Sequence, residues 1–347
     1  MAKIIYGVAG EGSGHASRSK ILIEHLLGQG HQVKVVSHDK GYENLSPYFD
    51  VLKISGLRMT YKHNQLHYVE TLFANLLKLP GLQRSFQKIK NLIEEFAPQI
   101  IISDFEPLTA LIAHLKNISL ISVDNQHQLT NTRFSYPREY LEEAVLAKTV
   151  SRLMVYRTKA YLVTSFFNTP ITHARTYLFP PILRQEVLEA RPSQGNFVLI
   201  YVNSNFSDLV DVLEKIGKQF VVYGISSNKK IKNITFKKPS QKEFLEDLTH
   251  CQAVIATAGL SLISEALYLG KPYLAIPVKH QFEQILNAYY LEKLGYGKFL
   301  KEITREGIES FLFDLPFYDR NLLKYKRSDN RQIFNKLDSL IQKYSIK

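Results

Sequence analysis

The chain has a single cysteine, Cys251, among its 347 residues. One cysteine excludes an internal disulfide and zinc sites built on paired cysteines, and it is typical of proteins from the reducing cytosol. No run approaches the ~20 apolar residues that a membrane-spanning helix needs, and the first residues lack the apolar segment of a signal peptide. No D-x-D carboxylate pair is present either, so we expect a cytoplasmic protein with no metal site.

Composition and length indicate a folded protein of two domains. Hydrophobic residues make up 45% of the chain and charged residues 22%, which is a globular balance. The net charge of +12 favours polyanionic partners such as nucleic acid, anionic lipid or phosphorylated substrates. Basic and aromatic residues gather between Arg58 and Lys90, and this segment is either an ordinary solvated face or a surface that lies on a membrane.

Short apolar runs alternate along the chain with stretches in which apolar residues recur at helical spacing. The strands expected in the first half are Lys3–Ala9, Val33–Ser37, Gln99–Ser103, Ser119–Val123 and Ala160–Ser165, with helices at His67–Leu79, Leu82–Phe96, Leu108–Leu115 and Glu139–Tyr156 among those between them. The strands expected in the second half are Phe197–Val202, Gln219–Tyr223, Ala253–Ala256 and Tyr273–Ile276, with helices Leu209–Ile216, Lys242–Leu248, Ser261–Leu269 and Glu283–Leu294.

This alternation predicts an α/β protein with two doubly wound domains that face a cleft. We place the first domain at residues 1–180 and the second at residues 181–315. Residues 316–347 end in the helix Arg331–Tyr344, which has nothing after it and could pack back on the first domain. A ligand is expected at the carboxyl ends of the strands.

A glycine-rich loop, Gly10–His15, joins the first strand to its helix. The backbone of Gly12, Ser13 and Gly14, together with Arg18, suits an anion or a closely approaching acceptor. The dinucleotide fingerprint G-x-G-x-x-G fails here because His15 occupies its third glycine position. Asp39, at the end of the second strand, leaves NAD binding as a minor alternative.

Three residues at strand ends are candidates for a general base. His15 begins a helix whose dipole disfavours the imidazolium, which keeps a neutral base available, although a histidine there also serves simply as a packing or capping residue. Asp104 and Glu106 follow another strand. Asp104 is suited to orient His15, to act as the base itself, or to cap the next helix.

The strongest pattern lies between Ala253 and Gly297, where a strand leads into Gly259, Leu260 and Ser261 at the start of a helix. The free N–H groups there would hold a diphosphate, and Glu265 would accept hydrogen bonds from a ribose. Polar residues crowd onto the loop and helical turn after the next strand, where they suit the hydroxyls of a sugar: His280, Gln281, Glu283, Gln284 and Asn287.

This pattern resembles the donor-binding half of GT-B nucleotide-sugar glycosyltransferases, and most of all the family 28-like group of the lipid II-forming N-acetylglucosaminyltransferase and the monogalactosyldiacylglycerol synthases. The residues that match are Gly259, Ser261, Glu265, Pro277, Gln281, Gln284 and Asn287. The segment Gly10–Arg18 is similar to the glycine loop of the same family. The chain departs from the group at Asn203–Asn205, where better-known members have a glycine-rich loop.

The resemblance implies an inverting, metal-independent transferase. It would use a nucleotide sugar, a UDP-sugar, as substrate, and would need no resident cofactor. The acceptor would be a glycan or lipid-linked acceptor of the cell envelope, met at an anionic membrane surface on its cytoplasmic face, and no nucleic acid is expected as a partner. A nucleotide-sugar epimerase or hydrolase of the same fold remains an alternative, as does a non-catalytic module that binds a nucleotide sugar or nucleic acid.

Overall fold

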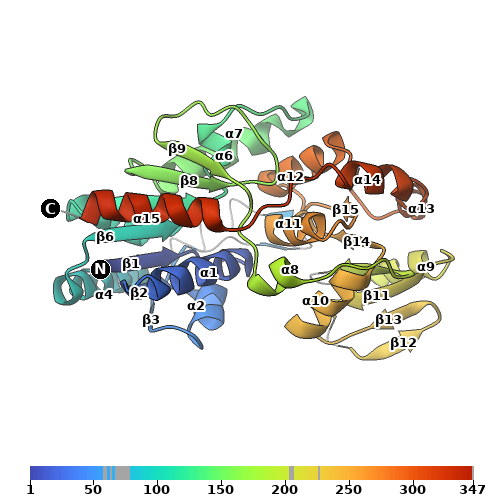
Figure 1. Cartoon of the computed structure of the whole chain (residues 1–347), viewed down its shortest axis with the longest axis horizontal. Helices are drawn as coiled ribbons and strands as arrows, with labels where there is room; N and C mark the ends of the chain where they lie inside the picture. The colour runs from blue at the N-terminus through green and yellow to red at the C-terminus, as the bar shows by residue number, and fades with distance from the viewer. Residues whose placement is uncertain (58–60, 63–64, 67–78, 203–206, 226, 346–347) are drawn as a thin grey trace. The chain divides into compact units, whose positions relative to one another are not determined.

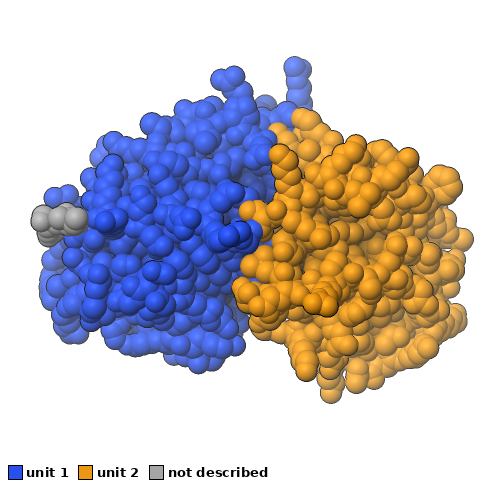
Figure 2. Space-filling model, viewed as in Figure 1, with its two compact units in different colours: residues 1–62, 66–184, 329–347 blue, residues 63–65, 185–328 orange. Residues whose placement is uncertain are grey.

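The apolar runs of the chain form two seven-stranded sheets, each in its own unit (Figure 1). The computed structural model describes residues 1–57, 61–62, 65–66, 79–202, 207–225 and 227–345. Unit 1 comprises Met1–Lys62, Leu66–Arg184 and Asp329–Lys347, and unit 2 comprises His63–Gln65 and Gln185–Ser328 (Figure 2). The predicted helix His67–Leu79 falls almost wholly outside the described residues.

The elements of unit 1 alternate between strand and helix. In chain order they are β1 (Lys3–Val8), α1 (Gly14–Gly28), β2 (Gln32–Ser37), α2 (Asp39–Leu45), β3 (Val51–Lys53), α4 (Leu79–Phe96), β6 (Ile100–Asp104), α5 (Pro107–Leu115), β7 (Ser119–Asp124), α6 (Gln128–Asn131), the 3₁₀ turn η1 (Arg138–Tyr140), α7 (Leu141–Met154), β8 (Ala160–Thr164), β9 (Thr176–Phe179) and α15 (Arg331–Ser345). A separate two-stranded sheet pairs β4 (Tyr61–Lys62) with β5 (Gln65–Leu66).

Unit 2 repeats the alternation with shorter strands. Its elements are α8 (Gln185–Glu189), β10 (Phe197–Tyr201), α9 (Ser207–Leu213), β11 (Gln219–Tyr223), β12 (Lys229–Ile231), β13 (Ile234–Phe236), α10 (Gln241–His250), β14 (Ala253–Ala256), α11 (Leu260–Tyr268), β15 (Tyr273–Ala275), α12 (Phe282–Lys293), β16 (Gly297–Phe299), α13 (Arg305–Phe313) and α14 (Leu315–Leu322). Apart from His67–Leu79, the predicted strands and helices are present. The short strands β3, β9, β12, β13 and β16 were not predicted, because three or four residues rarely establish a periodicity. The equally short β14 and β15 were predicted because they are uninterrupted apolar runs.

The strand order places a switch point in each sheet. Unit 1 has the order β3-β2-β1-β6-β7-β8-β9, and all of its pairs are parallel. Unit 2 has the order β12-β13-β11-β10-β14-β15-β16, in which only the edge pair β12–β13 is antiparallel. The order reverses between β1 and β6 and between β10 and β14. Ligands of open α/β sheets bind at the carboxyl ends of strands beside such a reversal. Two doubly wound domains are therefore confirmed.

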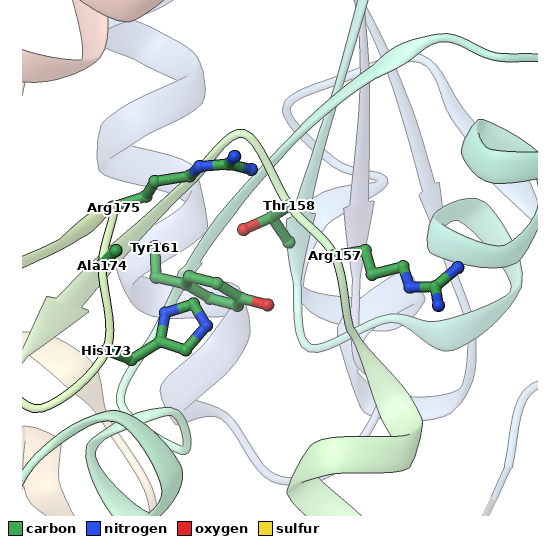
Figure 3. A pocket seen from close by; sticks show the side chains of 6 residues that line it. All are labelled: Arg157, Thr158, Tyr161, His173, Ala174 and Arg175. Carbon is green, nitrogen blue, oxygen red and sulfur yellow. The ribbon is translucent and has the colours of Figure 1, made fainter.

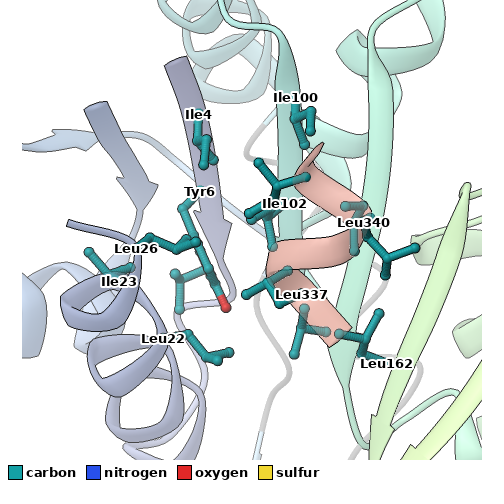
Figure 4. Packing of buried hydrophobic residues seen from close by; sticks show 14 of the residues in the cluster. Ile4, Tyr6, Leu22, Ile23, Leu26, Ile100, Ile102, Leu162, Leu337 and Leu340 are labelled. Atoms are coloured by element: carbon teal, nitrogen blue, oxygen red, sulfur yellow. The ribbon is translucent and has the colours of Figure 1, made fainter. Parts of the chain in front are cut away.

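The C-terminal helix α15 packs on the sheet of unit 1. Its apolar residues recur at the spacing of one helical face, and Leu337 and Leu340 lie against Ile4, Ile102 and Leu162 of the strands (Figure 4). On its polar side, His25 Nε2 of α1 lies 2.9 Å from Oδ1 of Asp338. The last segment of the chain thus completes the first core.

The boundaries between the units differ from the predicted ones. The first falls after Arg184 rather than after residue 180, and the chain returns to unit 1 at Asp329 rather than at residue 316. The physical reason for the second difference is helix α14, because its residues Leu315 and Tyr318 are buried in the core of unit 2. Among the described residues, no helix is both long and apolar enough to cross a membrane.

Candidate functional site

In unit 1, the carboxyl ends of β1 and β6 bring His15 and Asp104 together. The loop after β1 leads into α1, of which His15 is the second residue, and Asp104 is the last residue of β6. Nδ1 of His15 lies 2.7 Å from Oδ1 of Asp104. The two residues are 89 positions apart in the sequence, and they meet because β1 and β6 are neighbours at the switch point.

Asp104 is fully buried and accepts hydrogen bonds at both carboxylate oxygens. Arg18 donates from Nε to Oδ2 at 2.7 Å and from Nη2 to Oδ1 at 2.5 Å. Ser19 Oγ donates to Oδ2 at 2.8 Å. A planar guanidinium matches a carboxylate in this two-point arrangement, which fixes the plane of the carboxylate and therefore the direction in which it faces His15.

The charge of Arg18 keeps Asp104 ionised. Burial alone would raise the pKa of Asp104, but the guanidinium and the hydrogen bonds from His15 and Arg18 outweigh it and hold the pKa at about 2. Nη2 of Arg18 also lies 2.8 Å from Nδ1 of His15. Arginine only donates, so Nδ1 either accepts from Arg18 or donates to Asp104. The ionised carboxylate at 2.7 Å is the better partner for Nδ1–H, and this leaves the lone pair on Nε2.

Arg18 lies elsewhere than predicted. The sequence placed it with the loop residues that would contact an anion, but its side chain is buried beneath the loop, where it also donates to Asn125 Oδ1. It is therefore a positioning residue for Asp104. Gly12 and Ser13 are exposed, and Gly12 has a left-handed backbone with φ of 66°. The N-terminus of α1 at Gly14 has no side-chain cap.

Glu106 caps a helix. Its carboxylate accepts from the backbone N–H groups of Leu108 at 3.1 Å and Thr109 at 2.6 Å, at the N-terminus of α5. The sequence assigned the capping alternative to Asp104, whereas the structure gives it to Glu106. Pro107 is the signal that identifies the cap, because proline favours the first helical position and the residue before it is then the N-cap. Both oxygens of the Glu106 carboxylate accept hydrogen bonds from the backbone of α5, so Glu106 has a structural role among the described residues.

The end of β7 adds two further residues to this site. Asn125 accepts from Arg18, and the amide nitrogen of Gln126 lies 3.5 Å from Nε2 of His15. The next histidine, His127, forms a different buried pair, with Nδ1 2.6 Å from Oδ2 of Asp124 and Nε2 2.8 Å from the carbonyl of Val155. Both of its ring nitrogens are engaged, so His127 has a structural role.

In unit 2, the loop after β14 ends at Gly259, the N-cap of α11. No side chain caps this helix, so its first N–H groups lack the usual partner. Gly259 has a φ of −69°, which any residue adopts, and a Cβ built on it would have no atom within 4 Å. Neither backbone strain nor packing within the described protein therefore requires glycine here. Leu260 is half-buried and Ser261 exposed, and Glu265 follows on α11 with a largely buried side chain.

Two residues predicted to hold a sugar have hydrogen bonds to the loops beside them. Nδ2 of Asn287 donates to the carbonyl of Ala258 at 3.0 Å, and Oε1 of Gln284 accepts from the N–H of Val278 at 3.0 Å. Both side chains are buried. Asn287 thus fixes the loop just before Gly259, and Gln284 fixes the loop before α12.

The other predicted residues of unit 2 lie nearer the surface. His280 is exposed and has a left-handed backbone with φ of 64°, Gln281 is the half-buried N-cap of α12, and Glu283 is half-buried in the first turn. The segment Asn203–Asn205 lies outside the described residues. Within the described part of the chain, no group of three or more His, Cys, Asp or Glu side chains could hold a metal ion.

The family model and the curated relatives that match this chain are all glycosyltransferases. The family model described as Glycosyl transferase family 1 matches residues 2–316. An uncharacterized glycosyltransferase of Methanosarcina mazei is 24% identical, over 92% of this chain and 92% of its own length. The Clostridium tetani UDP-N-acetylglucosamine–N-acetylmuramyl-(pentapeptide) pyrophosphoryl-undecaprenol N-acetylglucosamine transferase is 32% identical over 38% of this chain and 40% of its own length.

The solved structures show the same fold. The glycosyltransferase of kitacinnamycin superposes with a TM-score of 0.73 at 15% sequence identity, and the match covers 97% of this chain and 98% of that one. The resemblance to GT-B glycosyltransferases drawn from the sequence is confirmed.

Proposed function

Because the chain belongs to glycosyl transferase family 1 and is a glycosyltransferase, we propose that it moves a sugar from a UDP-sugar to a hydroxyl acceptor, with inversion and without a metal ion. The observation that carries the proposal is the pair of His15 and a buried, ionised Asp104 at the switch point of unit 1. No resident cofactor is invoked, since the nucleotide sugar is itself a substrate.

His15 is the proposed general base. With Nδ1–H donated to Asp104, Nε2 accepts the proton of the acceptor hydroxyl. The acceptor oxygen forms a bond to the anomeric carbon while the bond from that carbon to the diphosphate oxygen breaks, so the configuration inverts. Asp104 then stabilises the imidazolium that forms. Arg18 acts through Asp104 as a positioning residue, and Glu106 is left as a helix cap.

The N-terminus of α11 is the proposed diphosphate site. The N–H groups of Gly259, Leu260 and Ser261 would donate to the departing diphosphate, and the helix dipole favours its charge, as a metal ion otherwise would. The open space beside Gly259 supports this assignment, because a ligand that approaches the backbone closely requires a residue without Cβ. Glu265 would bind the ribose, and His280, Gln281 and Glu283 the sugar, while Gln284 and Asn287 hold the loops that carry this site.

The acceptor is proposed to be a glycan or lipid-linked acceptor of the cell envelope, met at the cytoplasmic face of the membrane. Helix α7 supports a membrane contact, because Leu141, Val145 and Leu153 are each more than half exposed along one side of it. Arg152, beside Leu153, is exposed as well. Apolar residues next to a cation are typical of surfaces that lie on anionic lipid. Sedimentation with anionic vesicles at low salt tests this contact, and no co-sedimentation would refute it.

The donor is tested by thermal unfolding with UDP, GDP, ADP and dTDP, each with and without EDTA. A ligand at 100 times its dissociation constant stabilises the protein by about 2.7 kcal/mol. We expect UDP to raise the midpoint whether or not EDTA is present. Gly259→Ala should leave the ligand-free protein within about 1 kcal/mol of the parent, since its Cβ enters open space, while reducing the UDP shift. A shift abolished by EDTA would contradict metal independence.

The base is tested with His15→Ala. We expect turnover to fall by about 10²–10⁴-fold while the UDP shift is retained. His250→Ala is the matched control, because His250 is an exposed histidine of unit 2. Among the described residues, its ring bonds only the carbonyl of Glu246 one turn earlier. NMR of the product tests inversion at the anomeric carbon. Full turnover in His15→Ala would rule out His15 as the base.

A further inference from the structure

A hollow opens at the amino-terminal edge of the sheet of unit 1, the edge opposite to Asp104. It has a volume of about 490 Å³ and lies between the residues that precede β8 and those that precede β9. The side chains that line it are Arg157, Thr158, Tyr161, His173, Ala174 and Arg175 (Figure 3). The proposed transfer reaction uses none of these residues.

The stretch of sequence that supplies the lining of the hollow carries only positive charges. From residue 144 to residue 185 the chain has no Asp or Glu, whereas it has six Lys and Arg residues. Arg157 and Arg175 are exposed, and neither guanidinium has an ion pair or hydrogen bond with another described residue. Two arginines that meet no carboxylate of the described residues and line the same hollow are free to bind an anion.

Tyr161 supplies an independent observation. Its side chain is only 6% exposed, yet among the described residues its hydroxyl has no hydrogen-bond partner. Its ring is fixed, with the centroid 4.6 Å from that of His127 and 5.3 Å from that of His173. In Figure 3 the hydroxyl points toward the side that Thr158 and Arg157 line. A hydroxyl that bonds no described residue, on a ring held in place by two histidines, is available to donate to a ligand in the hollow.

The wall of the hollow is held by the backbone. The N–H of Thr172 donates to the carbonyl of Asn131 at 2.8 Å, and the N–H of Arg133 donates to the carbonyl of Pro170 at 2.8 Å. Nδ2 of Asn131 also donates to Thr176 Oγ1 at 3.1 Å. The segment that carries His173 and Arg175 is therefore fixed against the end of α6, so Arg175 projects from a rigid frame.

We propose that this hollow binds the phosphate group of a small phosphorylated ligand or of a lipid headgroup. Arg175 donates to the phosphate oxygens from one side, and Arg157 donates from the other once its exposed side chain turns inward from the direction seen in Figure 3. The hydroxyl of Tyr161 donates a further hydrogen bond. A volume of about 490 Å³ exceeds that of a bare phosphate and is ordinary for a small organic molecule that carries one. This site is independent of the proposed donor and acceptor.

The test uses the full chain and two sources of phosphate. Calorimetry measures the binding of inorganic phosphate and of glycerol 3-phosphate, and sedimentation measures binding to vesicles of phosphatidylglycerol against phosphatidylcholine. Arg157→Ala and Arg175→Ala should each weaken binding about tenfold or more, as loss of a charge-assisted hydrogen bond does. Arg191→Ala is the matched control, because it removes the same charge from an exposed position of unit 2.

Tyr161→Phe separates binding from folding. Since the hydroxyl bonds no described residue, the ligand-free melting temperature should stay the same, while phosphate binding weakens about threefold to tenfold. If the soluble phosphates bind and the three variants weaken that binding, the ligand is a small soluble phosphate compound. If only the vesicles bind and the three variants weaken that binding, the ligand is a lipid headgroup. The proposal is overturned if neither source binds, or if Arg191→Ala weakens binding as much as Arg157→Ala.

Discussion

Breaking the pair of Arg18 and Asp104 should destabilise unit 1 far more than its surface ion pairs do. Arg18→Met removes the guanidinium that donates to both carboxylate oxygens of a fully buried Asp104. Asp104→Asn removes the negative charge and leaves the guanidinium buried without its counter-charge. The double variant removes both charges, so it should recover part of what each single change loses.

The magnitude follows from the pKa of Asp104. Folding holds this pKa at about 2 against an ordinary value of 3.8, and at about 1.4 kcal/mol per pKa unit the difference is about 2.5 kcal/mol of stability at neutral pH. Removing one partner of a buried pair costs about 3–5 kcal/mol, because the other charge stays buried. We therefore expect each single variant to lose about that much, and the coupling between the two changes to be about 2 kcal/mol or more.

The assay is urea unfolding of the parent, both single variants and the double variant. The chain has no tryptophan, so Tyr177→Trp, introduced into all four proteins, gives a fluorescence signal from unit 1 alone. Lys34 and Asp50 form the control pair in the same unit, because their side chains are 38% and 72% exposed. An exposed pair should show a coupling of at most about 1 kcal/mol. The reasoning would be refuted if the losses of unfolding free energy from Arg18→Met and Asp104→Asn were simply additive in the double variant and no larger than the losses measured for the control pair.

Three further changes test single contacts. Glu106→Ala should cost about 1–2 kcal/mol in urea unfolding, because α5 loses its N-cap, while turnover at a temperature where the variant is folded stays within severalfold of the parent. Asn287→Leu leaves the carbonyl of Ala258 without its partner, and should cost about 1–3 kcal/mol in urea unfolding and weaken UDP binding. Acid should destabilise unit 1 progressively from about pH 4 to about pH 2. The pKa of Asp104 is lower in the folded chain than in the unfolded chain, so ionised Asp104 stabilises the fold at pH values above its unfolded pKa. This stabilisation is lost as the pH falls through the folded pKa of about 2. The same titration of Asp104→Asn should be flatter.

The architecture could be predicted from the sequence because its signals are local. Apolar runs such as β1 and β6 are bounded by glycine, proline or polar residues, and their alternation with helical patterns is enough to predict two parallel sheets. The meeting of His15 with Asp104 was open to prediction for the same reason. Both follow strands that end at one edge of the sheet, so only the choice of neighbouring strand had to be right.

The partners of individual side chains could not be predicted in the same way. Asn287 and Ala258 are 29 positions apart, and nothing local distinguishes an asparagine that holds a loop from one that holds a sugar. The absence of Asp and Glu from residues 144–185 is a sequence signal for the hollow. Which arginines line it depends on the path of the loop between β8 and β9. The choice between Asp104 and Glu106 as the helix cap was the exception, since Pro107 identifies it.

The inward position of Arg18 links the stability of unit 1 to the chemistry proposed for His15. The sequence analysis placed Arg18 with the residues that would contact an anion, because the start of a helix after a glycine loop is a common anion-binding site. In the folded chain the guanidinium turns inward, and three consequences follow from that one placement. Asp104 stays ionised although it is buried, its fixed plane directs Oδ1 at His15, and Nδ1–H of His15 has a defined acceptor. The position of the lone pair on Nε2 is therefore set by a residue that contacts no substrate in the proposed reaction.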